Sequence, residues 1–273
     1  MPTYSIENYR FLLRTALDQG YQFVGFLDPD DGIGRRIYLR HDVDYSLEMA
    51  VELARVDAEF GIASTFCLLV RSQIYNLLSK FSLQHVDEIL TLGHSVALHY
   101  AAPAVLPSSD AELAALVLED FSIVQRNVTA LVLPAFAWHN VTAELISRGL
   151  NLEIPGLANI YGRSFIRDIP YFSDSNMRYS VGEFEEIIGH GRHRSLHLLF
   201  HPLNWVAGGD DMMQILVRTW PYVIRERELD MRLNREWAKY AATGIPTGVL
   251  DDFVTGLERS LRNSGPTSHG SQG

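Results

Sequence analysis

Carboxylates and imidazoles stand where apolar runs of this sequence end. Asp42 and Asp44 follow the apolar run at 37–39, and a histidine follows each of three later runs: His99, His139 and His201. In parallel α/β folds the carboxyl ends of the strands meet at one edge, and the loops there form the active site. We expect these five side chains to share one site, because independent structural roles give no reason for strand ends to match so consistently.

The spacing of the two aspartates indicates a cation. Asp42 and Asp44 are two positions apart, so they point to the same side of an extended strand, whereas His41 points to the opposite side. Two carboxylates held close in a partly buried site repel each other, and a cation beside them relieves that repulsion. We expect one carboxylate to bind a divalent metal and the other to remain free as a base. Arg40 is interpreted as their charge partner, with a substrate clamp as the alternative.

Two further histidines are not expected to join this site. His94 is five positions from His99 and therefore on the opposite face of a straight strand, so we interpret it as structural. His197 shares a face with His201, but only His201 stands at the end of its strand.

The elements that must position these residues alternate between strand-like and helical patterns. Strands are expected at 37–39, 65–70, 95–99, 131–136 and 195–200. Helices are expected from Ser46 to a stop at Gly61, at 86–92, at 113–127 behind the capping-box pair Ser109 and Glu112, from 212 to 240, and at 249–261. We interpret the stretch at 208–211 as a loop and helix cap. The alternation predicts right-handed crossovers and a parallel sheet, either open or closed into a barrel.

Composition narrows the class of protein. The chain has 273 residues, 47% of them hydrophobic, which is enough for one α/β domain over 1–262, and the Gly- and Ser-rich tail at 263–273 is expected to be disordered. A net charge of -10 argues against a nucleic-acid duplex or an anionic membrane as partner. The single cysteine, Cys67, excludes a disulfide framework and a cysteine-rich metal site. Because no signal segment or membrane span is evident, we expect a cytoplasmic protein.

Several short motifs resemble those of a known family. The sequence Arg-His-Asp-Val-Asp at 40–44 and the stretch at 93–100 resemble the first two motifs of the polysaccharide deacetylase superfamily, the NodB-homology carbohydrate esterases. More specifically, they resemble a divergent branch often found with bacterial surface-glycan genes. That branch also shows a stretch like the one at 75–80, a Ser-Asp-Ser like that at 173–175, and a late His-Pro like that at 201–202. The resemblance spans about 38–205.

The resemblance implies a fold, a reaction and a division of roles. The fold would be α/β, a distorted (β/α) barrel of parallel strands with its active site at the C-terminal strand ends. The reaction would be hydrolysis of acetyl groups on sugars with one divalent metal, most often zinc, with cobalt, nickel or manganese as alternatives. Asp42 would be the general base, Asp44 and His99 metal ligands, and His201 the general acid.

The sequence departs from the family at the third ligand. The family's second motif has another histidine four residues after the position of His99, and Pro103 stands there. His139 is the expected substitute, with water or a substrate group as the alternative. Residues expected to bind substrate are Arg40, Tyr75, Trp138, Asp174 and Trp205, together with Tyr171. Ordinary aromatic packing is the alternative for the aromatic ones.

These observations predict a metal-dependent deacetylase acting on an N-acetylated sugar or glycan precursor, whether free, nucleotide-linked or lipid-linked. Two alternatives stay open: a catalytically inactive glycan-binding protein on the same fold, and a hydrolase of another carbon–nitrogen bond in a natural-product substrate. The expected partner is therefore a small molecule or glycan precursor, and the sequence is compatible with a homo-oligomer.

Overall fold

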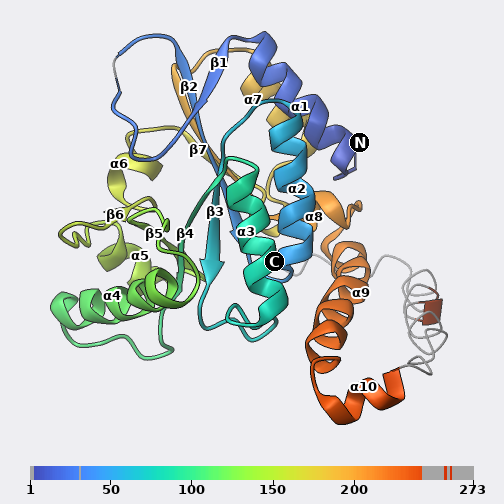
Figure 1. Ribbon diagram of the computed structural model, residues 1–273. Helices are drawn as coiled ribbons and strands as arrows, with labels where there is room; N and C mark the ends of the chain where they lie inside the picture. Colours follow the sequence, from blue (N-terminus) through green and yellow to red (C-terminus); the bar gives the residue numbers. More distant parts are fainter. Residues whose placement is uncertain (1–2, 31, 242–254, 257–258, 260–273) are drawn as a thin grey trace, which may run out of the picture.

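A curled sheet of parallel strands forms the centre of the computed structural model, and helices surround its outer side (Figure 1). The structure describes residues 3–30, 32–241, 255–256 and 259. Within these residues the strand order is β6-β5-β4-β3-β2-β8-β7, with β1 paired beside β3 on the same edge of β2. The strands are β1 (Tyr21–Val24), β2 (Arg35–Val43), β3 (Thr65–Leu69), β4 (Ser95–Ala101), β5 (Ala135–His139), β6 (Ala158–Asn159), β7 (Tyr171–Ser173) and β8 (Ser195–Phe200).

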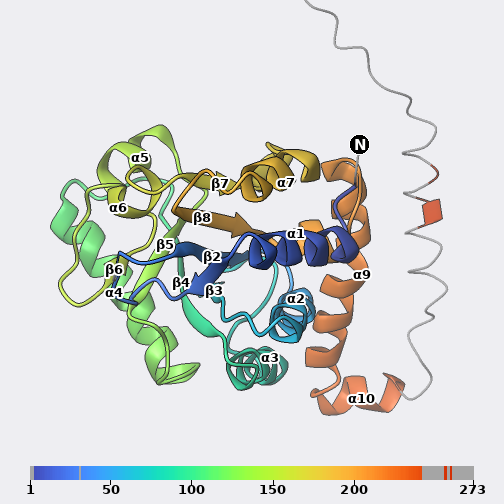
Figure 2. The same ribbon diagram turned by 90° about the horizontal axis from the view of Figure 1, so that it is seen from above.

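The sheet is open between β6 and β7 in the described part of the chain, so it forms a half-barrel, as the view from above shows (Figure 2). This confirms the predicted α/β fold with a distorted parallel barrel. All pairings between neighbouring strands are parallel. Their carboxyl ends therefore gather at one edge, which is where ligand sites form in such sheets.

Apolar clusters on both sides of the sheet hold the strands. On the outer side, α1 (Ile6–Asp18), α2 (Leu47–Glu59) and α7 (Val181–Gly189) pack on β2 and β8, while α3 (Lys80–Thr91) and α4 (Asp110–Asn127) extend the core over β3 to β5. The inner side carries small residues and a few rings, including Cys67, Ala97 and Phe26. Small side chains on the inner face leave room for the long polar ones of β2.

Most of the remaining helices border the carboxyl ends of the strands or lie beside the outer layer, whereas the short helix at 163–166 packs Phe165 against the inner apolar cluster. They are α5 (Ala143–Gly149), α6 (Arg163–Ile166), the 3-10 turn η1 (Ser175–Met177), α8 (Pro202–Val206), α9 (Met212–Met231) and α10 (Arg235–Ala241). Helix α9 lies beside α2 and α3 (Figures 1 and 2). No helix in the described residues is long and apolar enough to cross a membrane.

The capping residues and the helix-ending glycine predicted from the sequence are found at several helix ends. The Ser46 hydroxyl accepts from the Met49 amide and caps α2, and Gly61 follows that helix with a φ of 68°. Ser109 and Glu112 form the expected capping box, and Asp211 caps α9.

Other boundaries differ from the prediction. The strand expected at 131–136 begins only at Ala135, because a turn on the Thr129 hydroxyl occupies the preceding residues. Helix α3 begins at Lys80, six residues before the helical pattern that predicted it. The predicted tail and most of the helix expected at 249–261 lie outside the described residues.

Candidate metal centre

The five residues predicted to share a site meet in one cavity of about 980 Å³. Asp42 lies near the end of β2 and Asp44 just beyond it, while His99, His139 and His201 come from or follow β4, β5 and β8. Inward-facing residues alternate along β2, so Asp42 faces the cavity, whereas His41 faces α2 and contacts Asp57 at 2.9 Å. The opposite orientation predicted for His41 is thus confirmed.

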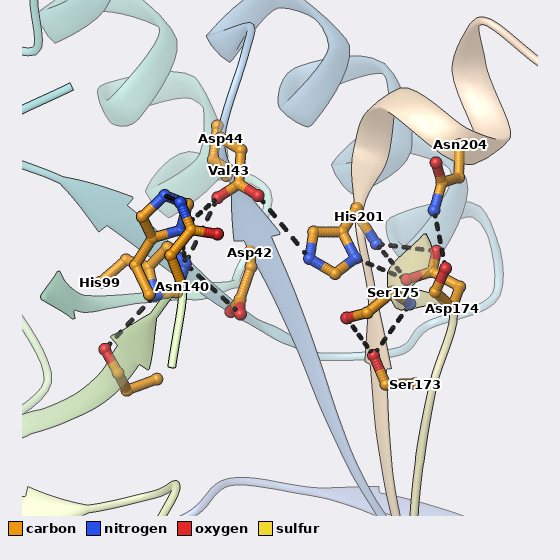
Figure 3. Close-up of polar contacts among 12 residues, drawn as sticks. Asp42, Val43, Asp44, His99, Asn140, Ser173, Asp174, Ser175, His201 and Asn204 are labelled. Atoms are coloured by element: carbon orange, nitrogen blue, oxygen red, sulfur yellow. Dashed lines mark hydrogen bonds and ion pairs between the residues drawn. The ribbon is translucent and has the colours of Figure 1, made fainter. Parts of the chain in front are cut away.

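Asp44, His99 and His139 form a group that could hold a metal ion (Figure 3). Asp44 Oδ1 is 3.3 Å from His99 Nε2 and 3.3 Å from His139 Nδ1, and the two nitrogens are 3.0 Å apart. Ligand atoms bound tetrahedrally to zinc at about 2.0–2.1 Å lie about 3.3 Å from one another. The three atoms therefore fit one face of a zinc coordination shell, and their donor types suit the metal.

Neighbouring groups orient both imidazoles of this metal triad, the name used below for Asp44, His99 and His139. His99 Nδ1 is 3.3 Å from the carbonyl oxygen of Ala137, so the proton belongs on Nδ1, and Nε2 presents its lone pair to the cavity. His139 faces the triad through Nδ1, and its Nε2 is 2.8 Å from the side-chain amide nitrogen of Asn140. A half-turn of this amide puts its oxygen in the same place, where it accepts the Nε2 proton and leaves the Nδ1 lone pair for a metal. Asn140 has a φ of 48°, a backbone conformation that asparagine tolerates better than most residues.

Asp42 is held by the side chain two positions before it. The guanidinium of fully buried Arg40 contacts both carboxylate oxygens of Asp42, at 2.9 Å from Nε and 3.2 Å from Nη2. Burial raises the pKa of Asp42, but the charges of Arg40 and the nearby imidazoles outweigh it, so the pKa lies below its ordinary value. Arg40 is therefore the charge partner of Asp42, and its guanidinium also lies 5.7 Å from the centre of the Tyr161 ring.

Asp44 is the carboxylate that the imidazoles surround. Burial raises its pKa, but hydrogen bonding to His139 and His99 and the charge of His201 hold the pKa well below its usual range. In Figure 3, Asp44 lies between His99 on one side and His201 on the other, and His201 Nε2 is 3.7 Å from Asp44 Oδ2. An ionised carboxylate in this position is ready to bind a cation.

A buried carboxylate holds His201. Asp174 accepts from the His201 backbone amide at 2.9 Å, lies 2.5 Å from Nδ1 of the same residue, and accepts from the Trp205 indole at 2.9 Å. Burial lowers the pKa of His201, but the Asp174 charge and hydrogen bond exceed that effect and raise the pKa to about 9. His201 is therefore an imidazolium at neutral pH, with Nε2 directed toward Asp44.

The structure changes the role of three residues predicted to bind substrate. Tyr75 is buried and its hydroxyl is used inside the protein: it donates to the Val43 carbonyl at 2.9 Å and accepts from the Leu69 amide at 2.8 Å. Asp174 and Trp205 are fully buried and are not among the residues that line the cavity: Asp174 contacts His201, and Trp205 donates to Asp174. Burial of their polar atoms in internal hydrogen bonds leaves none of the three free for a ligand.

The other predicted substrate-binding residues do line the cavity. Arg40, Trp138 and Tyr171 contribute to its wall, although the Trp138 indole nitrogen is turned toward the Gly149 carbonyl. Tyr161 and Asn140 also belong to this wall, and the sequence patterns did not predict them. Asn140 directly follows His139, and that adjacency was the one available signal. Tyr161 follows the two-residue strand β6, which has no recognisable pattern.

Searches among known proteins give matches only at the level of structure. No protein-family model and no curated protein matches this chain. Solved structures that are similar include a CE4 family pseudoenzyme from Bacillus anthracis, with 13% identity, a TM-score of 0.43, and coverage of 71% of this chain and 64% of that one. Our chain thus spans less than two thirds of the pseudoenzyme's length.

Two others are the Xyl-CE4 domain of a multidomain xylanase from the hindgut metagenome of Trinervitermes trinervoides and the deacetylase PplD of Streptococcus pyogenes in complex with acetate. The first has 15% identity, a TM-score of 0.40, and coverage of 72% and 84% of the two chains. The second has 11% identity, a TM-score of 0.39, and coverage of 73% and 84%.

Proposed function

We propose that this protein is a metal-dependent hydrolase that removes an acetyl group from an N-acetylated sugar or glycan precursor. The observation that carries the proposal is that a carboxylate, Asp42, and an imidazolium, His201, both lie beside the metal triad. Asp42 Oδ2 is 3.5 Å from the ligand atom of His99, and His201 Nε2 is 3.7 Å from Asp44. A base and an acid that both adjoin the metal triad would suit the two proton transfers of amide hydrolysis.

The metal triad would hold one divalent ion, with zinc the first candidate and cobalt, nickel or manganese the alternatives. When bound, such an ion supplies a Lewis acid that polarises the acetyl carbonyl and lowers the pKa of a water molecule. Two imidazoles and one carboxylate leave further coordination positions open, which is typical of catalytic sites. His139 thereby takes the place of the family histidine missing at Pro103, which is exposed beyond the end of β4.

Asp42 and His201 would carry the protons. Asp42 is ionised throughout the neutral range and is kept in place by Arg40, so it accepts the proton of the attacking water. His201 holds a proton at Nε2 because Asp174 stabilises its charged form, so it donates to the departing amine. The two residues thus perform different steps because their environments move their pKa values in opposite directions.

The wall of the cavity suits a saccharide. Tyr161, Tyr171 and Trp138 line it together with polar groups such as Asn140 and Ser175. Aromatic faces with a few placed polar groups are what sugar rings bind to. The volume of about 980 Å³ leaves room for more than one sugar unit.

Release of acetate tests the proposal. Zinc-loaded protein is incubated with a panel of N-acetylated sugars and chito-oligosaccharides, and acetate is quantified by NMR. We expect acetate release by the wild type and a loss of at least about 100-fold in Asp42→Asn with its metal retained. Asp87→Asn makes the same substitution at an exposed position of α3 and should leave the rate unchanged.

The same assay separates the alternatives. Saccharide binding by fully zinc-loaded protein without acetate release would favour an inactive glycan-binding protein, the alternative that Pro103 supports. Equal rates for Asp42→Asn and the wild type would refute the role of Asp42 as base.

A further inference from the structure

A buried carboxylate that the proposed chemistry does not use lies on α9. Glu226 is only 4% exposed, and its Oε1 accepts two hydrogen bonds from the start of α2: from the Ser46 hydroxyl at 2.6 Å and from the Glu48 amide at 2.8 Å. Ser46 is only two residues after the metal-triad member Asp44. Glu226 therefore fastens the segment that leads from β2 through Asp44 into α2.

The hydrogen bonds of Ser46 explain why a carboxylate suits this position. The Ser46 hydroxyl accepts from the Met49 amide at 3.1 Å and donates its only proton to Glu226, so a partner that accepts suits this position. The negative charge also lies at the N-terminal end of α2, where the helix dipole favours an anion. Arg225, the neighbour of Glu226, adds an ion pair with Glu48 at 2.6 Å.

The Tyr75 hydroxyl holds the same segment on the N-terminal side of Asp44, as Glu226 does on its C-terminal side. The Tyr75 hydroxyl bridges the Val43 carbonyl and the Leu69 amide, so it fixes the last residue of β2. Asp44 thus lies between two fixed points, Val43 and Ser46. Tyr75 and Glu226 are not among the residues that line the cavity, but both hold the backbone that carries Asp44 and so affect where its carboxylate lies relative to the two histidines.

Helix α9 also contributes to the wall of the cavity through Met212 and Leu216 in its first two turns. The same helix therefore borders the space for substrate at one end and holds the start of α2 through Glu226 further along. Its placement beside α2 and α3 is visible in Figures 1 and 2. Because α9 makes both contacts, the packing of α9 and the position of Asp44 are linked through this one helix.

We propose that Glu226 is a positioning residue for the metal centre, which holds the Asp44 carboxylate in register with His99 and His139 and makes metal affinity depend on the docking of α9. This inference rests on the metal site of the proposed function. It assigns a role to a residue about 180 positions away from the ligand it acts upon.

Zinc affinity of two Glu226 variants tests the proposal. Glu226→Leu removes the acceptor, whereas Glu226→Gln keeps a carbonyl oxygen in the same place. Zinc dissociation constants are measured by competition with a chromophoric chelator, and the cobalt-loaded proteins are compared by visible absorption. We expect a loss of affinity of about 10-fold or more for Glu226→Leu, as for partners that orient metal ligands, with an altered cobalt spectrum. Glu226→Gln should stay within about 3-fold of the wild type.

A matched variant controls for effects on α9 itself. Glu228 lies two residues further along the helix and pairs with Arg232 at 2.6 Å, away from α2. Glu228→Leu should leave the zinc affinity unchanged. Ser46→Ala provides a second test if Glu226→Leu does not fold. It removes one of the two hydrogen bonds to Glu226 together with the cap on the Met49 amide, and it should weaken zinc binding by a smaller factor.

The outcomes distinguish the inference from the proposed function. A Glu226→Leu protein that melts earlier but binds zinc with the wild-type constant and spectrum has lost only a structural contact, and this would refute the positioning role alone. Zinc binding by Ser46→Ala with the wild-type constant would refute that role as well. A wild-type protein that binds no zinc would refute the metal centre, and the inference would fall with it.

Discussion

Replacing Asp174 by asparagine removes the charge that keeps His201 protonated. The carboxylate of Asp174 receives hydrogen bonds from the His201 backbone, the His201 ring and the Trp205 indole. An amide has one oxygen acceptor and an NH₂ donor, so it cannot satisfy three donors at once. The substitution thus changes the charge state of His201 while it preserves the size of the buried side chain.

The size of the effect follows from the pKa of His201. A rise from the ordinary value of 6.5 to about 9 corresponds to about 3 kcal/mol in favour of the charged ring. Burial opposes that rise, and the charge of Asp174 is its largest cause. In Asp174→Asn the burial effect remains while the largest raising cause is gone, so the pKa of His201 should fall below about 9, even with the charges of Asp44 and Asp42 still raising it.

An NMR titration of the metal-free protein measures this pKa directly. The ring protons of His201 are assigned by comparison with His201→Gln, and their shifts are followed from about pH 5 to about pH 10. We expect a midpoint near 9 in the wild type and a midpoint at least about one pH unit lower in Asp174→Asn. A wild-type midpoint near 6.5, or the same midpoint in both proteins, would refute the reasoning on the general acid.

Two further predictions concern other parts of the structure. Asn140→Gly keeps the left-handed backbone at φ 48° but loses the contact with His139 Nε2, so its zinc dissociation constant should rise about 10-fold. Asn140→Asp keeps an oxygen acceptor at this position and should bind zinc at least as tightly as the wild type. Equal zinc dissociation constants for all three proteins would contradict the role of Asn140. His197 is buried, and burial together with the Arg40 charge lowers its pKa to about 3, so the unfolded chain takes up the proton first as pH falls below 6.5. Stability should therefore decrease toward acid pH by up to about 1.4 kcal/mol per pH unit, and urea denaturation at pH 7 and pH 5 should show a smaller decrease in His197→Asn than in the wild type.

The parallel sheet and the grouping of five polar residues could be predicted because both follow from local patterns, whereas the distorted barrel was implied by the family resemblance. Strong apolar runs mark β2, β3, β4 and β8. A polar residue at the end of such a run must lie at the edge where the carboxyl ends of parallel strands meet. The alternation along β2 was sufficient to separate His41 from Asp42 and Asp44. The i,i+2 spacing likewise placed Arg40 beside Asp42.

The residues that support the site could not be predicted, because their partners lie far away in the sequence. Glu226 stands in a strongly charged helical stretch, where nothing in the pattern separates a buried carboxylate from a solvated one. Tyr75 and Trp205 are aromatic residues near motifs, and only the fold shows that their polar atoms are used inside the protein. The strands β1, β6 and β7 have two to four residues, too few for a periodic pattern.

Metal content tests the central claim most directly. The protein is loaded with zinc, dialysed, and analysed by elemental mass spectrometry together with His139→Ala and the control His190→Ala, which makes the same substitution at an exposed position after α7. We predict one zinc ion per chain in the wild type and in His190→Ala, and a large loss in His139→Ala. A wild type without zinc, or a His139→Ala protein that retains a full equivalent, would contradict the assignment of Asp44, His99 and His139 as the metal centre.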